Sequence, residues 1–141
     1  MARIIAIDYG TKRVGVAVTD PLQMIASPLD TIHPLKLMEF LKNYLHQEEV
    51  ECFVLGWPKN LDNSDTEMIQ HVKGFHRKLE KEFPDKAVHL VDERFTSKMA
   101  LDAMIRSGSK KKDRMQKTGN LDKVSATIIL QSYLESKQNG F

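Results

Sequence analysis

The chain has 141 residues, a formal net charge of +2 at pH 7 and a single cysteine. This length suits one hydrophobic core, so we expect a single domain over residues 1–141. One cysteine excludes an intrachain disulfide and a zinc site made of several thiolates. No apolar run reaches the length of a membrane span and no signal-type segment is present, so we expect a cytoplasmic protein without a membrane partner.

Positive charge is concentrated in one segment, from Arg106 to Lys117, which holds six basic residues and one acid. A patch of this kind is typical of a surface that binds a polyanion. A solvated loop would carry the same charge, and charge alone does not separate the two interpretations.

The first three predicted elements are strands over residues 3–8, 13–20 and 24–32. A tight turn that contains Gly10 joins the first two. Pro28 lies within the third, which favours an edge position in the sheet. A helix then begins at Pro34 and ends near Glu48. Its apolar side is predicted to consist of Leu35, Leu37, Met38, Leu41 and Leu45.

Strands and helices alternate in the rest of the chain. Ser64, Thr96 and Asn120 are predicted to cap the helices among these elements. The elements are strands over residues 51–57 and 87–91, and helices over 64–83, 96–107 and 120–136. This order predicts an α/β fold, with a mixed sheet that opens as an antiparallel meander, continues with parallel strands and is flanked by helices.

Two carboxylates end predicted strands. Asp8 follows a run of aliphatic residues, and Glu93 stands beside Asp92 at the end of the last strand. If both strands are central, their ends lie close together at the edge of the sheet where α/β proteins bind ligands. Successive strand residues face opposite sides, so Asp92 and Glu93 should not both face Asp8.

A third carboxylate, Asp122, lies near the start of the last predicted helix. It shares a helical stripe with Ala126, Ile129 and Tyr133, which predicts that it faces the sheet. Its expected place in the first turn offsets the cost of burying the charge only in part.

Three converging carboxylates, without cysteine or histidine ligands, favour Mg²⁺ or Mn²⁺. Each acid also has a structural interpretation. Asp8 can cap a turn, Glu93 can pair with Arg94, and Asp122 can be an ordinary acid at a helix start. Spacing alone leaves both interpretations open.

The chain resembles one family in four motifs, which occur in the family's order and spacing: Asp8-x-Gly10-x-x-Arg13-x-Gly15-x-Ala17, Gly56-x-Pro58, Asp92-Glu93-Arg94-x-Thr96, and Asp122 before an Ala/Ile-rich helix. This family is YqgF, also called the RuvX or Holliday junction resolvase group and described as the pre-16S rRNA nuclease. The resemblance implies an RNase H-like fold related to RuvC-type resolvases. It also implies a divalent-metal phosphodiesterase centre at Asp8, Glu93 and Asp122.

The resemblance also indicates where nucleic acid binds. A flexible basic loop over residues 108–119 would hold the phosphate backbone without reading sequence. Arg13 can instead pair with a nearby acid, and Thr96 can be only a helix cap. The residues expected to contact nucleic acid are Lys12, Arg13, Arg94, Thr96, Lys110, Lys111, Lys112 and Arg114.

These observations predict a metal-dependent nuclease that acts on pre-rRNA or branched DNA. The family resemblance, not the residues themselves, favours a nuclease that trims the 5′ end of pre-16S rRNA, with ribosomal particles as partners. A Holliday junction resolvase is the first alternative, and it should act as a symmetric dimer; we expect a monomer or a weak homodimer. A non-catalytic nucleic-acid-binding module is the second. Actin-like ATPases and sugar kinases share the Asp8–Thr11 turn, but 141 residues cannot supply the second domain that they need.

Overall fold

The computed structural model describes residues 2–57, 67–92 and 118–138. The described strands form one sheet in the order β3-β2-β1-β4-β5. β1 pairs antiparallel with β2 and parallel with β4, and β5 continues the parallel part. The elements are β1 (Arg3–Asp8), β2 (Val14–Thr19), β3 (Ala26–Ile32), α1 (Pro34–Gln47), β4 (Val50–Trp57), α2 (Glu67–Glu82), β5 (Ala87–Asp92) and α5 (Thr118–Gln138). The predicted mixed sheet is confirmed, and so is the edge position of the strand that contains Pro28.

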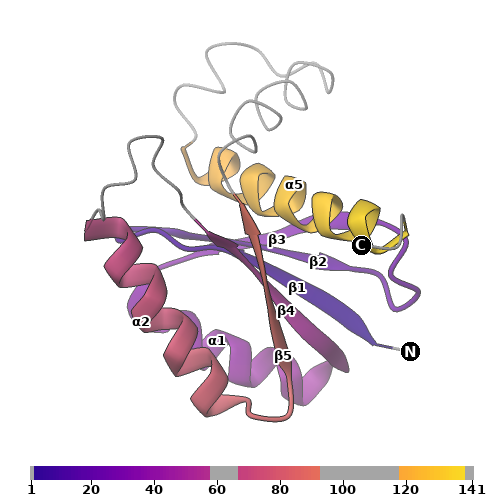
Figure 1. Ribbon diagram of the computed structural model, residues 1–141, viewed down its shortest axis with the longest axis horizontal. Helices are drawn as coiled ribbons and strands as arrows, with labels where there is room; N and C mark the ends of the chain where they lie inside the picture. Colours follow the sequence, from indigo (N-terminus) through magenta and orange to yellow (C-terminus); the bar gives the residue numbers. More distant parts are fainter. Residues whose placement is uncertain (1, 58–66, 93–117, 139–141) are drawn as a thin grey trace.

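Helices cover both faces of the sheet, with α1 and α2 on one side and α5 on the other (Figure 1). The residues of β1 alternate between these faces. Ile5 and Ile7 belong to the core under α1 and α2, whereas Ile4 and Ala6 belong to the core under α5. Because side chains alternate along a strand, Asp8 is the next residue on the α5 face.

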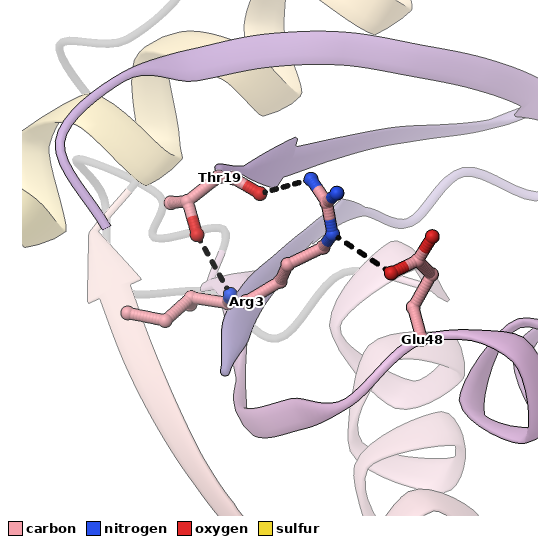
Figure 2. Close-up of polar contacts among 4 residues, drawn as sticks. Arg3, Thr19 and Glu48 are labelled. Carbon is pink, nitrogen blue, oxygen red and sulfur yellow. Dashed lines mark hydrogen bonds and ion pairs between the residues drawn. The ribbon is translucent and has the colours of Figure 1, made fainter. Parts of the chain in front are cut away.

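The start of β1 is held by Thr19 of β2 and by Glu48, the residue that follows α1 (Figure 2). Arg3 donates from Nε to Glu48 Oε2 at 3.2 Å and from a terminal nitrogen to the Thr19 carbonyl at 3.1 Å. The Thr19 hydroxyl is fully buried and accepts the Ile4 N–H at 2.9 Å. These contacts, together with strand pairing along both edges, make β1 a well-supported base for Asp8.

The predicted apolar side of α1 is correct except at its first residue. His33 caps this helix, and its side chain accepts the Leu35 N–H at 3.1 Å. Leu37 and Leu41 are fully buried, but Leu35 is 85% exposed. Leu35 lies about 200° around the helix from Leu37, so it points away from the core.

The third strand begins two residues later than the predicted residue 24. The Asp20 carboxylate accepts the N–H groups of Met24 and Ile25, at 2.8 Å each, and these bonds hold both residues in the turn. The same bonds lower the pKa of Asp20. Local side-chain bonding of this kind competes with strand pairing.

Helix α5 begins at Thr118, before the predicted cap at Asn120, and it ends at Gln138. Asn120 therefore lies inside the first turn, and Asp122 lies just beyond that turn. The effect of the helix dipole declines within the first turn, so it contributes less to Asp122 than the sequence indicated. The last two residues of the predicted loop over 108–119 are helical, whereas residues 108–117 and the predicted helix over 96–107 lie outside the described residues.

Candidate active site

Three parallel strands end at the same edge of the sheet. β1 ends at Asp8, β4 at Trp57 and β5 at Asp92. Ile7 is in register with Leu55, and Leu55 with Leu90, so Asp8 is nearly level with the end of β5. However, β4 separates β1 from β5, and β5 is an edge strand. The closeness of the two strand ends depended on both strands being central, and β5 does not meet this condition, so about 10 Å separates the two backbones.

Asp8 stands between two glycines on the α5 face. Gly15 of β2 is its direct register partner. In β4, Leu55 pairs with Ile7, so the next residue, Gly56, lies level with Asp8. Gly56 faces the same side of the sheet as the buried residues Cys52 and Val54. Neither glycine has a Cβ, so the partly exposed carboxylate has side-chain-free positions on both sides. Glycine at such places permits close approach of a ligand.

The turn after Asp8 is fixed by close packing. Tyr9 stacks on Phe75 of α2, with ring centroids 4.8 Å apart, and burial raises the pKa of Tyr9. A Cβ added to Gly10 would lie 2.5 Å from the carbonyl oxygen of Arg13. This turn presents Lys12 and Arg13, both exposed, at the same edge of the sheet as Asp8.

Gly10→Ala is expected to lower the free energy of unfolding by about 1–3 kcal/mol, because a backbone oxygen must move to admit the methyl group. Gly74→Ala is the matched control. A Cβ at Gly74 meets no described atom within 4 Å, and alanine there should stabilise the protein by about 0.4–1 kcal/mol. Urea denaturation measures both. Equal stability of Gly10→Ala and the wild-type protein would contradict the close packing of this turn.

Helix α5 crosses the face that carries Asp8. Ala126 and Ile129 are fully buried against it. Lys137, near the end of α5, donates to Gln23 at 3.1 Å and lies 3.5 Å from Glu51 at the start of β4. The end of α5 is therefore at the edge where the parallel strands begin, and its start is toward the opposite edge, where β1 ends (Figure 1).

Cys52 is a buried thiol beneath α5, as expected for a structural cysteine. It is 3% exposed, and burial raises its pKa. The Tyr133 hydroxyl hydrogen-bonds this thiol, and burial followed by the neighbouring thiol raises the pKa of Tyr133 to about 12. Tyr133 also packs against His89, with ring centroids 5.0 Å apart. Because the raised pKa values keep the Cys52 thiol and the Tyr133 hydroxyl neutral near pH 7, this cluster contributes packing between α5 and the sheet and no charge.

The structure describes only part of the predicted site. Asp8, Lys12 and Arg13 are described, and Asp122 is placed by its backbone in α5. Among the described side chains, no three histidine, cysteine or acidic groups lie close enough together to hold a metal ion. The other predicted site residues lie outside the described residues, namely Glu93, Arg94, Thr96, Lys110, Lys111, Lys112 and Arg114.

Trp57 packs against a neighbouring helix. Trp57, which ends β4, is half-buried and packs edge-on against His76 of α2, with ring centroids 5.9 Å apart. Its ring is therefore engaged within the domain. None of the helices in the described part of the chain is both long enough and apolar enough to cross a membrane.

Residues 2–136 match the family described as RuvX: Holliday junction resolvase. A protein of Amoebophilus asiaticus named "Putative pre-16S rRNA nuclease" is 51% identical over 136 residues, which cover 96% of each chain. A Bacteroides fragilis protein of the same name is 49% identical over 138 residues, covering 98% of this chain and 99% of the relative.

Solved structures of resolvases share the fold. Thermus thermophilus RuvC in complex with a Holliday junction substrate aligns with a TM-score of 0.63 and 18% identity, over 99% of this chain and 97% of that one. The fowlpox virus Holliday junction resolvase aligns with a TM-score of 0.59 and 15% identity, over 96% and 99%. The fold is thus a RuvC-like RNase H fold. With the family match over nearly its whole length, the chain belongs to the RuvX family of nucleases.

Proposed function

We propose that this protein is a divalent-metal-dependent nuclease that processes the 5′ end of pre-16S rRNA in the cytoplasm. The observation that carries the proposal is the position of Asp8, at the carboxyl edge of the sheet between two glycines. The substrate follows from the names of relatives that are 49–51% identical over nearly their full length. We propose Asp8, Glu93 and Asp122 as the metal-binding acids.

The packing of α5 supports a place for Asp122 near Asp8. Tyr133 contacts Cys52, which is in register with Ile4. From Tyr133 back to Asp122 the helix rises about 16 Å, and from Ile4 to Asp8 the strand rises about 13 Å. Both displacements run toward the same edge, so position 122 is nearly level with Asp8. The buried residues Ala126 and Ile129 share its helical stripe.

The alternation of β5 favours Glu93 over Asp92 as a ligand. His89 packs against Tyr133 of α5, and Val91 belongs to the core under α5. This is the face of Asp8. We therefore infer that Glu93, the next odd-numbered residue in the sequence, is a better candidate ligand than Asp92, which is even-numbered.

The donor set fits a hard cation. Carboxylate oxygens suit Mg²⁺ and Mn²⁺, and the glycines beside Asp8 leave room for a ligand. A bound ion of this kind polarises a phosphodiester and lowers the pKa of a bound water. The chain's own groups then bind and orient the RNA. Lys12 and Arg13 would contact phosphate beside Asp8, and Arg94, Thr96 and the basic segment over 108–119 would hold the flanking backbone.

Metal removal tests the proposal. Purified protein with Mg²⁺ or Mn²⁺ is expected to cleave a 5′-extended pre-16S RNA, alone or within ribosomal particles, and to leave a 3′-hydroxyl end. Chelation by EDTA should abolish cleavage and added Mn²⁺ should restore it. Gel analysis of end-labelled RNA measures both. Cleavage that persists in EDTA, or no cleavage under any of these conditions, would contradict the proposal.

Branched DNA is the second candidate substrate, because the family description and the structural neighbours name Holliday junction resolvases. A four-way junction offered in the same assay separates the two. Symmetric cutting of the junction by a dimer would favour resolution. Cleavage of RNA alone by a monomer or a weak homodimer would favour rRNA processing.

A further inference from the structure

Helix α2 carries a basic ridge on its exposed side, formed by Gly74, Arg77, Lys78 and Lys81. These residues stand at positions i, i+3, i+4 and i+7, so they share one helical face, and all four are exposed. The opposite face packs into the core through Ile69, Val72, Phe75 and Leu79. The ridge is therefore a surface that the fold of the described residues leaves without a partner.

The acids of this half of α2 are directed away from the ridge. Glu80 lies 3.5 Å from His76 on one flank, and Glu82 lies 3.2 Å from Lys42 of α1 on the other. Within the part of the chain that the structure describes, none of the three ridge cations forms an ion pair. The positive charge of the ridge is thus available to an anion from outside the domain.

Gly74 also points to an external partner. Glycine is among the least favourable residues in a helix interior. A Cβ at this position would meet no described atom within 4 Å, so packing inside the described domain does not require glycine. A helix backbone without a side chain lets a bulky ligand approach closely.

The ridge belongs to the layer of α1 and α2, on the side of the sheet opposite Asp8. Phe75, adjacent to Gly74, stacks on Tyr9, the neighbour of Asp8. From Arg77 to Lys81, the residues that carry the charge, the helix rises about 6 Å. One strand of a B-DNA duplex carries a phosphate about every 3.4 Å along the axis, so a span of about 6 Å corresponds to two or three successive phosphates.

We propose that the basic ridge of α2 binds the phosphate backbone of the RNA substrate at a distance from the cleaved bond. The inference rests on the proposed nuclease function, and it adds a binding surface distinct from the predicted basic segment over 108–119. The contact is to phosphate, so it orients the substrate without selecting its sequence.

The test measures RNA binding without cleavage. In an Asp8→Asn background, the double variant Arg77→Gln/Lys81→Gln is compared with the double variant Lys86→Gln/Lys137→Gln, which removes the same charge from positions outside the ridge. Fluorescence anisotropy with a labelled RNA duplex that has a single-stranded overhang gives Kd at several salt concentrations. The ridge variant should bind roughly tenfold more weakly, and the slope of log K against log salt should fall by about 2. In the control variant, the slope should differ from that of the parent protein by less than about 0.5.

Gly74→Gln gives a second readout that a structural role would not produce. Glutamine favours helix, so the unfolding midpoint should rise, while its side chain should weaken RNA binding a few-fold. A Gly74→Gln protein that is more stable and binds as tightly as its parent would overturn the close approach at this residue.

The outcomes separate this inference from the proposed function. If the wild-type protein cleaves RNA but the ridge variant binds like the control, the ridge is not a binding surface and the nuclease stands. If the wild-type protein cleaves nothing but the ridge variant alone loses binding, the ridge stands and the nuclease fails. Ridge-dependent binding to anionic vesicles or acidic peptides, without binding to the duplex, would also overturn the inference.

Discussion

Asp8→Asn is expected to reduce RNA cleavage by about a thousandfold or more. The substitution keeps the shape of the side chain but removes the carboxylate charge at the edge where β1 ends. A thousandfold loss corresponds to about 4 kcal/mol of transition-state stabilisation, within the several kcal/mol that a catalytic metal supplies. Single-turnover cleavage of labelled pre-16S RNA measures the effect.

The same variant should remain folded and bind RNA. Strand pairing and the Arg3–Thr19–Glu48 contacts hold β1 without the Asp8 charge, so the unfolding midpoint should shift by only a few degrees. RNA affinity should stay within a few-fold of wild type. Cleavage by Asp8→Asn at the wild-type rate would place the chemistry elsewhere or in a contaminant.

Ala126→Leu is expected to lower the cleavage rate by about a hundredfold. Ala126 is fully buried between α5 and the sheet, against a core that includes Ala6, two residues before Asp8. A larger side chain there must displace α5, at a cost of about 1–3 kcal/mol in stability. A displacement of about 1 Å in a catalytic constellation can cost a hundredfold in rate.

Ile5→Val is the matched control for Ala126→Leu. Ile5 is fully buried in β1, the strand that carries Asp8, but it faces α1 and α2. The substitution should cost about 0.5–1.5 kcal/mol in stability and leave cleavage near the wild-type rate. Equal losses of cleavage in both variants would indicate that lost stability, not the position of α5, limits the reaction.

Local pattern predicted the elements that lead to the site. A run of aliphatic residues ending in a carboxylate gave the bounds of β1 without error, because a central strand is apolar on both faces. The helical stripe through Ala126, Ile129 and Tyr133 likewise identified the side of α5 that faces the sheet. These signals are strong because burial follows the period of the element.

The misses arose where a nonlocal or side-chain effect decided. The Asp20 carboxylate holds Met24 and Ile25 in a turn that their apolar character did not indicate. The edge position of β5 depends on strand order, which the order of elements along the chain does not define. Gly15 and Gly56 stood in the family motifs, but the reason for them became visible only when strand register placed them around Asp8.

The basic ridge of α2 was also missed, although the sequence contains a signal for it. Arg77, Lys78 and Lys81 lie among acids, so the segment looks nearly neutral. Helical spacing separates them, because Glu80 and Glu82 fall on the flanks and pair with His76 and Lys42. A search for like charges on one helical face would have found the ridge.

Binding of Mn²⁺ to the metal-free protein, measured without RNA, tests most directly the claim that Asp8, Glu93 and Asp122 share a metal site. Titration calorimetry compares the wild-type protein with Asp8→Asn, Glu93→Gln and Asp122→Asn. The account predicts saturable binding by the wild-type protein and at least roughly tenfold weaker binding by each variant, because each removes a carboxylate ligand. Unchanged Mn²⁺ affinity in Glu93→Gln or Asp122→Asn would contradict a metal site shared by these three acids.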